Sequence, residues 1–140
     1  MYGFEPIPAQ AGGTIRTARF VKPSTAADNA LLEADANEMA VGISDTGPRD
    51  APLDSANATD IAAYGDQFMY HPEGNVCLLE IGSGGVTRGA LIKSDADGKG
   101  VLALTSGTTN QWMGAIALET AVETEYARVL VKVFPQIWAA

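Results

Sequence analysis

The chain has 140 residues, a net charge of −8 and a hydrophobic content of 46%. This length fits one domain, and a domain of this size buries enough surface to fold without a metal ion or disulfide bonds. The hydrophobic content argues against a disordered chain, and the negative charge argues against a nucleic-acid partner, which would require a basic face.

The sequence shows no targeting or membrane segment. Residues 1–13 lack the basic start and apolar run of a signal peptide, and no apolar stretch approaches the roughly 18 residues of a transmembrane helix. We therefore expect a protein made in a cytoplasm, with no membrane partner. Cys77 is the only cysteine, and its apolar neighbours indicate a small buried side chain.

The first element that we expect is an extended N-terminal arm over residues 1–13. Pro6 and Pro8 favour extended backbone, and Gly12 and Gly13 provide a flexible joint. We expect a deletion of residues 1–12 to leave the melting temperature unchanged and to weaken attachment to a partner. The apolar and basic candidates for contact at this end are Tyr2, Phe4, Ile7, Arg16 and Arg19.

The rest of the chain predicts short strands separated by turns. β-Branched and aromatic residues, alternating polarity and turn residues favour strands over 14–22, 39–44, 67–71, 76–81, 86–94, 101–104, 111–119 and 126–134. Residues 24–38 are compatible with a short helix or an irregular strand pair. Residues 45–60 are rich in proline, glycine and acidic residues and predict a long surface loop.

This pattern predicts an all-β protein, or a β-rich one with a single short helix. The expected fold is a small antiparallel β-barrel or sandwich. We expect one barrel domain over residues 14–134, followed by a C-terminal tail over 135–140. Ile137 and Trp138 in this tail are further candidates for contact with the partner or with a second copy of the chain.

One stretch of the sequence is repeated weakly. Residues 39–44 (MAVGIS) resemble residues 112–117 (WMGAIA), each an apolar strand with an internal glycine. Glycine inside a strand marks a bulge or a close approach of the backbone. A duplicated half-barrel and chance both account for the similarity.

The sequence holds no convincing catalytic, metal or cofactor site, and we expect no enzyme and no cofactor. His71 is the only histidine, so histidine and cysteine cannot supply a zinc site, and a nucleophilic pair of His71 with Cys77 lacks the expected setting for a nucleophile. The turn at 95–100 fails the ligand pattern of a calcium-binding EF-hand. The acidic residues near 119–125 are typical of a solvated turn.

Three groups of motifs resemble the capsid-cement proteins that decorate tailed-phage heads. They are a glycine-rich entry into a strand that ends at Val-Lys-Pro, a Gly-Ala-Leu-Ile strand followed by a polar turn, and a Gly-Ala-Ile-Ala-Leu-Glu strand before the last strand. The residues are 11–15, 21–23, 62–67, 76–81, 89–95, 113–119 and 127–133. The long loop 45–60 and the apolar tail depart from this pattern.

The resemblance implies a compact β-barrel with an N-terminal arm on the exterior of the capsid. It also implies a homotrimer that clamps neighbouring subunits of the major capsid protein, and so a structural virion protein. Alternatives are a ring-forming virion component, such as a tail-tube or head-completion protein, and a small β-barrel enzyme or ligand-binding module. Replacing His71 or Cys77 with alanine should leave the assembly function intact.

Overall fold

The computed structural model describes residues 5–45, 60–103 and 111–136, and these residues are all-β. In chain order the strands are β1 (Ile7–Ala11), β2 (Ile15–Arg16), β3 (Phe20–Pro23), β4 (Ala30–Glu33), β5 (Gly42–Ser44), β6 (Asp60–Ala62), β7 (Gln67–Pro72), β8 (Val76–Glu80), β9 (Leu91–Ser94), β10 (Gly100–Leu102), β11 (Gln111–Ala117) and β12 (Tyr126–Gln136). The predicted all-β class is confirmed. No helix long and apolar enough to cross a membrane occurs among the described residues.

The N-terminal half forms a closed barrel with the strand order β1-β4-β3-β5-β7. Strands β1 and β4 are parallel, and the other four pairs are antiparallel. Side chains that alternate along the strands fill the interior, as a small barrel requires. They are Ala9, Ala11, Ile15, Val21, Leu31, Ala62 and Phe68.

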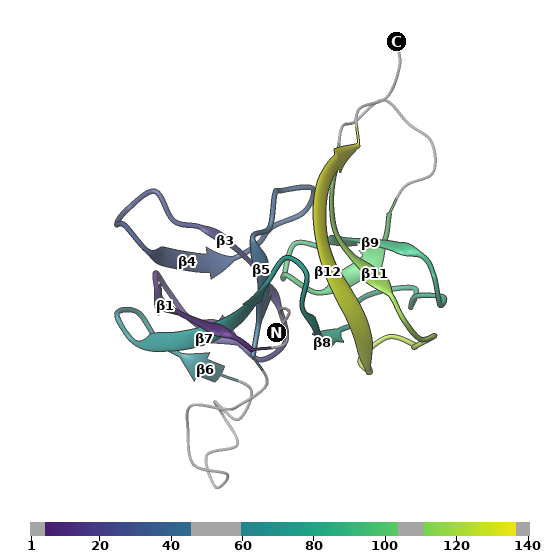
Figure 1. Cartoon of the computed structure of the whole chain (residues 1–140), viewed down its shortest axis with the longest axis horizontal. Helices are drawn as coiled ribbons and strands as arrows, with labels where there is room; N and C mark the ends of the chain where they lie inside the picture. The colour runs from purple at the N-terminus through teal and green to yellow at the C-terminus, as the bar shows by residue number, and fades with distance from the viewer. Residues whose placement is uncertain (1–4, 46–59, 104–110, 137–140) are drawn as a thin grey trace, which may run out of the picture.

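The C-terminal half forms a five-stranded antiparallel sheet with the order β10-β9-β11-β12-β8. Its two edges come together where Ile81 forms a parallel bridge with Gly100, and the Gly82 N–H donates to the Gly100 carbonyl at 2.8 Å. This sheet is therefore a second barrel, nearly closed between β8 and β10. The two barrels lie side by side, with β1 to β7 in one and β8 to β12 in the other (Figure 1).

The two barrels are repeats of one topology. Strands β1, β3, β4, β5 and β7 correspond to β8, β9, β10, β11 and β12, including the parallel contact of the first strand with the third. The registers also agree: Ile7 pairs with Tyr70 as Cys77 pairs with Val129. We call residues 6–72 repeat 1 and residues 76–131 repeat 2.

The other ladders repeat in the same way. Each cross-strand pair of repeat 1 has a counterpart in repeat 2. The matched pairs are Ala9–Phe68 with Leu79–Ala127, Lys22–Leu32 with Lys93–Val101, Phe20–Ile43 with Leu91–Ile116, Ile43–His71 with Ile116–Leu130, and Ile15–Ala62 with Val86–Ala121.

Even the turns match. In repeat 1 the Ala63 N–H donates to the Asp66 carboxylate at 3.0 Å, and in repeat 2 the Val122 N–H donates to the Glu125 carboxylate at 2.9 Å. Three pairs of equivalent residues also share a positive φ, a conformation that L-residues other than glycine rarely adopt. They are Ala18 and Gly89, Asn29 and Gly98, and Gly65 and Thr124.

The weak repeat seen in the sequence has a structural counterpart, because Gly42 and Ile43 of β5 occupy the places of Ala115 and Ile116 of β11. The duplicated unit is a whole barrel and not half of one. Both internal glycines mark a close approach, as expected. A Cβ on Gly42 would collide with the His71 carbonyl, and a Cβ on Gly114 would lie 2.5 Å from the Phe20 ring.

Repeat 1 packs against repeat 2 through the outward side of β3, β5 and β7. Phe20 and Ile43 point away from their own barrel, yet both are fully buried within the core of repeat 2. The backbone next to Phe20 joins the same contact: the Glu80 N–H donates to the Ala18 carbonyl at 2.9 Å, and the Phe20 N–H donates to the Gly98 carbonyl at 2.8 Å. The segment 18–20 therefore fills the gap between β8 and the β9–β10 turn.

Several sequence-based boundaries are wrong. Residues 7–11 are not an arm: they form β1, which pairs with both β4 and β7 inside the first barrel. Pro8 has no backbone N–H, and it is tolerated because the ladder needs no hydrogen-bond donor at this position. The single barrel expected over 14–134 is instead two barrels, and the first of them needs residues 7–11. A deletion of residues 1–12 would therefore destabilise the fold.

Two predicted strands are interrupted, and one open choice is settled. The strand expected over 14–22 divides into β2 and β3 at Ala18, and the strand expected over 86–94 is limited to β9 after Gly89, because positive φ breaks the extended backbone. Residues 24–38 contain turns and strand β4 and no helix. Most of the loop predicted over 45–60 lies outside the described residues.

The contact between Phe20 and Gly114 predicts a test of the packing between the repeats. Gly114→Ala adds a methyl group against the Phe20 ring and should lower the free energy of unfolding by about 1–3 kcal/mol. Combining it with Phe20→Leu should cost less than the sum of the two single changes, since the smaller side chain gives the methyl group room. Urea denaturation measures all four proteins, and simple additivity would contradict the contact.

Candidate binding surfaces

His71 and Cys77 are structural residues in this fold. The His71 ring lies 3.2 Å from an Asp45 carboxylate oxygen through Nε2 and 3.2 Å from the Asn75 amide through Nδ1, and the Asn75 amide also donates to the Glu5 carbonyl at 2.9 Å. These contacts fix the chain entering β1. Burial raises the pKa of the Cys77 thiol to about 12, and the nearby Asp45 charge acts in the same direction. Such a thiol is a poor nucleophile at neutral pH.

The polar turn 95–99 is a hairpin turn. One Asp95 carboxylate oxygen accepts the backbone N–H groups of Asp97 at 2.8 Å and Lys99 at 2.9 Å. This side chain thereby closes the β9–β10 connection in the way that aspartate commonly does in turns. Among the described residues, no group of three or more His, Cys, Asp or Glu side chains is arranged to hold a metal ion.

Arg19 joins the two repeats from a buried position. Its guanidinium donates to the Glu80 carboxylate at 2.9 Å and to the Asp97 carbonyl at 2.9 Å, and Lys99 lies 3.5 Å from the same carboxylate. The residue is only 4% exposed. The expectation that Arg19 contacts an external partner is wrong, because the side chain is buried and both terminal nitrogens of its guanidinium donate inside the chain.

Arg16 is also engaged internally, although it is partly exposed. Its guanidinium makes a two-point contact with the Glu33 carboxylate, at 2.8 Å and 3.1 Å, and its backbone N–H donates to the same carboxylate at 2.6 Å. The hydrogen bond to Glu33 raises the pKa of Arg16. Sequence reasoning identified both arginines as basic and missed their carboxylate partners, which lie 17 and 61 residues away.

The remaining predicted contact residues divide into two groups. Ile7 is 40% exposed in β1 and is free to meet a partner from the first barrel. Tyr2, Phe4, Ile137 and Trp138 lie outside the described residues.

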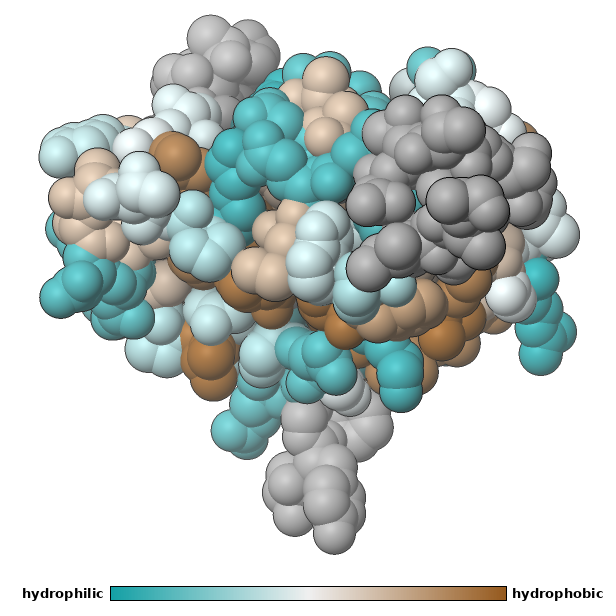
Figure 2. Space-filling model, turned by 90° about the horizontal axis from the view of Figure 1, so that it is seen from above, coloured by the Kyte–Doolittle hydropathy of each residue, from teal (hydrophilic) through white to brown (hydrophobic). Residues whose placement is uncertain are grey.

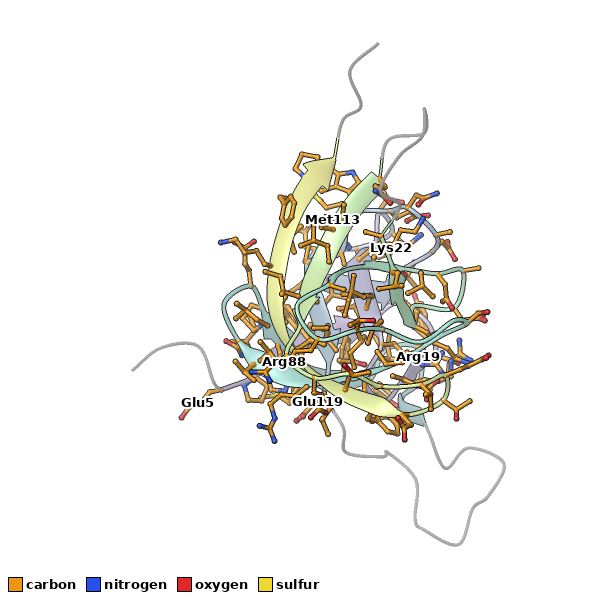
Figure 3. All side chains as sticks on the ribbon, turned by 90° about the vertical axis from the view of Figure 1, so that its right-hand side faces the viewer. Glu5, Arg19, Lys22, Arg88, Met113 and Glu119 are labelled. Carbon is orange, nitrogen blue, oxygen red and sulfur yellow. The ribbon has the colours of Figure 1, made fainter. Side chains whose placement is uncertain are left out.

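A larger apolar surface, which the sequence did not reveal, covers the outward side of repeat 2. Leu91, Ile116, Leu130 and Val76 are directly paired across β9, β11, β12 and β8 and so share one face. Leu118 and Leu78 extend it on either side of Arg128, and both are exposed. Figure 3 views the molecule from this side, with Arg88 and Glu119 at its lower end. We call this surface the outer face of repeat 2.

Elsewhere the molecule also exposes hydrophobic residues, which form a band across the view from above (Figure 2). A surface pocket of about 260 Å³ lies on repeat 1. It is lined by Pro8, Ala9, Gln10, Asn29, Gly65 and Gln67. The polar side chains at this pocket are the neutral amides of Gln10, Asn29 and Gln67, without an ionisable side chain among its lining residues.

The chain shares its fold with a solved phage protein. The crystal structure of the head fiber gp8.5 N base of bacteriophage phi29 superposes with a TM-score of 0.62, covering 91% of this chain and 93% of that chain at 18% sequence identity. No family model matches the chain, and no curated protein sequence matches it. The likeness extends over both repeats, so it concerns the whole arrangement and not one barrel alone.

The Arg19–Glu80 ion pair predicts a large effect on stability. Arg19→Ala removes the 2.9 Å partner of the Glu80 carboxylate, whose side chain is only 13% exposed, and it should lower the free energy of unfolding by about 3–5 kcal/mol. The exposed Lys132→Ala serves as control and should change it by less than about 0.5 kcal/mol. Chemical denaturation followed by circular dichroism measures both variants. Equal effects would show that Arg19 is not a structural link.

The raised pKa of Cys77 predicts slow thiol chemistry. At pH 8 the folded protein should react with a disulfide reagent roughly a thousandfold more slowly than the urea-unfolded chain, because almost no thiolate is present. The folded thiol keeps its proton where the unfolded thiol loses it, so this residue's contribution to stability should fall as the pH rises from about 9 to about 12. Fast labelling of the folded protein would show an accessible thiolate.

Proposed function

We propose that this chain is a structural protein of a phage head. The observation that carries the proposal is the shared fold with a phage head fiber base over 91% of the chain, together with the resemblance of its strand motifs to capsid-cement proteins. The described residues support a role in contact: the buried polar groups His71, Arg19 and Asn75 serve the fold, and exposed apolar side chains remain on both repeats.

In this proposal the protein binds the outside of the capsid as a homotrimer and stabilises it by clamping neighbouring subunits of the major capsid protein. Such a role needs many copies of a modest interface and no reactive group. Burial of apolar surface contributes roughly 25 cal/mol per Å² to each contact, and repetition over the lattice supplies avidity. The net charge of −8 keeps the unbound protein soluble.

The proposal predicts binding to heads that lack the protein. Purified chain added to such heads should saturate at on the order of hundreds of copies per head and raise the temperature at which the heads open. Gel densitometry gives the copy number, and a fluorescent-dye assay for released DNA gives the opening temperature. Saturation at roughly six to twelve copies would instead indicate a ring component.

Ile7 offers a variant for the same assay. Ile7→Asp changes an exposed side chain and should lower the number of bound copies while shifting the melting temperature little. Leu102→Asp, at a residue of similar exposure on β10, is the matched control. Equal binding by the two variants would remove Ile7 from the contact surface.

A further inference from the structure

The two repeats differ in one respect that concerns assembly: the equivalent outward faces are not equally covered. In repeat 1 the row Phe20, Ile43 and His71 is at most 9% exposed, because repeat 2 packs over it. The equivalent row in repeat 2 is Leu91, Ile116 and Leu130, part of the outer face of repeat 2. Leu91 is 38% exposed and Ile116 and Leu130 are half-buried, so this row is less covered than its counterpart in repeat 1.

We propose that a second copy of this chain covers the outer face of repeat 2 with its own repeat 1. The contact between copies would then repeat the head-to-tail contact that repeat 1 and repeat 2 make within one chain. Contacts of this kind use two different surfaces, and they close into a ring when the rotation permits. The inference rests on the homotrimer of the proposed function and names the surface that forms it: three chains place six barrels around one axis.

The chemistry of the outer face supports this occupant. On a sheet face that met only solvent, the side chains would be mostly polar, yet the four residues paired across the outer face are all apolar: Leu91, Ile116, Leu130 and Val76. Contiguous apolar surface of this kind marks an interaction site. The outer face of repeat 2 is also equivalent, residue by residue, to the surface that repeat 1 buries against repeat 2.

Charge identifies the part of the second copy that docks. Within one chain, the surface that receives repeat 1 includes Glu80 and the turn residues Asp97 and Gly98. The equivalent residues of repeat 1 are Gln10, Asp28 and Asn29, which are all exposed, and Gln10 and Asn29 line the 260 Å³ pocket. The acid at the turn is therefore retained in both repeats, as Asp28 and Asp97.

The complementary charges lie at the outer face. Arg88 is exposed beside the end of β11 (Figure 3), and its backbone N–H donates to Thr120. Arg128 is exposed between Leu118 and Leu78. Neither arginine forms an ion pair with another described residue. Arg88 is the equivalent of Thr17 in repeat 1. Thr17 lies between Arg16 and Arg19, the two arginines that reach the turn bearing Asp97 within the chain. In the proposed contact Arg88 meets Asp28 of the next copy.

The backbone of the proposed contact between copies differs from that of the internal contact at the gap between the first strand and the turn. Within the chain, residues 18–20 enter the gap between Glu80 and Gly98. In repeat 1 that gap is closed, since the Gln10 N–H donates to the Asn29 carbonyl at 3.0 Å. The outer face therefore packs over the closed surface of repeat 1 without inserting a segment. A contact without insertion is weaker than the internal one, which suits copies that associate after folding.

The test is a charge exchange followed by sedimentation. Arg88→Glu and Asp28→Arg should each raise the dissociation constant of the oligomer at least about tenfold, and the double variant should restore association, because the exchanged charges meet again between copies. Leu91→Glu should give a folded monomer. Leu102→Glu, outside the outer face, should associate like the unmodified chain. Circular dichroism melting curves establish that each variant is folded.

Two results would overturn the inference: an unmodified chain that sediments as a monomer at all concentrations tested, or a Leu91→Glu variant that associates normally. Head binding is measured separately on the same proteins. A monomeric chain that still saturates heads would refute this interface and leave the proposed function standing. If the unmodified chain forms an oligomer that Leu91→Glu disrupts but binds no heads, the interface is supported and the proposed function is refuted.

Discussion

The structure depends on the way in which one barrel completes another. The second barrel is open between β8 and β10 except for the bridge of Ile81 with Gly100. Residues 18–20 of the first barrel fill the opening with two backbone hydrogen bonds, the Phe20 ring and the Arg19–Glu80 ion pair. Because the unpaired backbone groups and the carboxylate of Glu80 would otherwise be stranded in a poorly hydrated gap, we expect the two repeats to fold as one cooperative unit.

The two surfaces of this contact belong to two repeats of the same five-stranded barrel. The fold, the registers and the turn hydrogen bonds of the repeats agree, while the side chains at the contact differ. Arg19 is matched by Ala90, Glu80 by Gln10, and Phe20 by Leu91. The first repeat thus carries the inserting segment and a closed barrel, and the second carries the opening and a partly exposed apolar face. Because of this asymmetry, the repeats pack through one pair of surfaces only. The outer face of repeat 2 and the closed surface of repeat 1 are left for a further partner.

The sequence predicted the fold class and most strands, because alternation and turn residues are local signals. It did not predict the internal duplication beyond one six-residue match, because insertions shift the frame between the repeats. Ile7 and Cys77 are 70 residues apart, Ile43 and Ile116 are 73 apart, and Ala62 and Ala121 are 59 apart. No single offset aligns the two halves. The arm was mispredicted because Pro8 and the Gly12-Gly13 pair look like breakers, whereas the β1 ladder includes Pro8 and ends only at Ala11, before the glycines.

The candidate surfaces could be predicted only in part, for a related reason. Exposed Ile7 was found from its position in the chain, but Arg19 was assigned to the surface because its buried partner Glu80 is distant in sequence. The outer face of repeat 2 arises from four strands whose residues become neighbours only through the register. A local pattern cannot show that Leu91, Ile116 and Leu130 form one row, or that the equivalent row in repeat 1 is buried.

The central claim is that two-repeat chains associate head to tail and act together on a phage head. An electron-microscopy map of purified particles that carry this protein tests it most directly. We expect density outside the capsid at threefold positions, with six barrels around each axis and Leu91 of each chain against the β3–β4 turn of the next. Isolated chains on the lattice, or rings in which the face bearing Leu91 points to solvent, would contradict it.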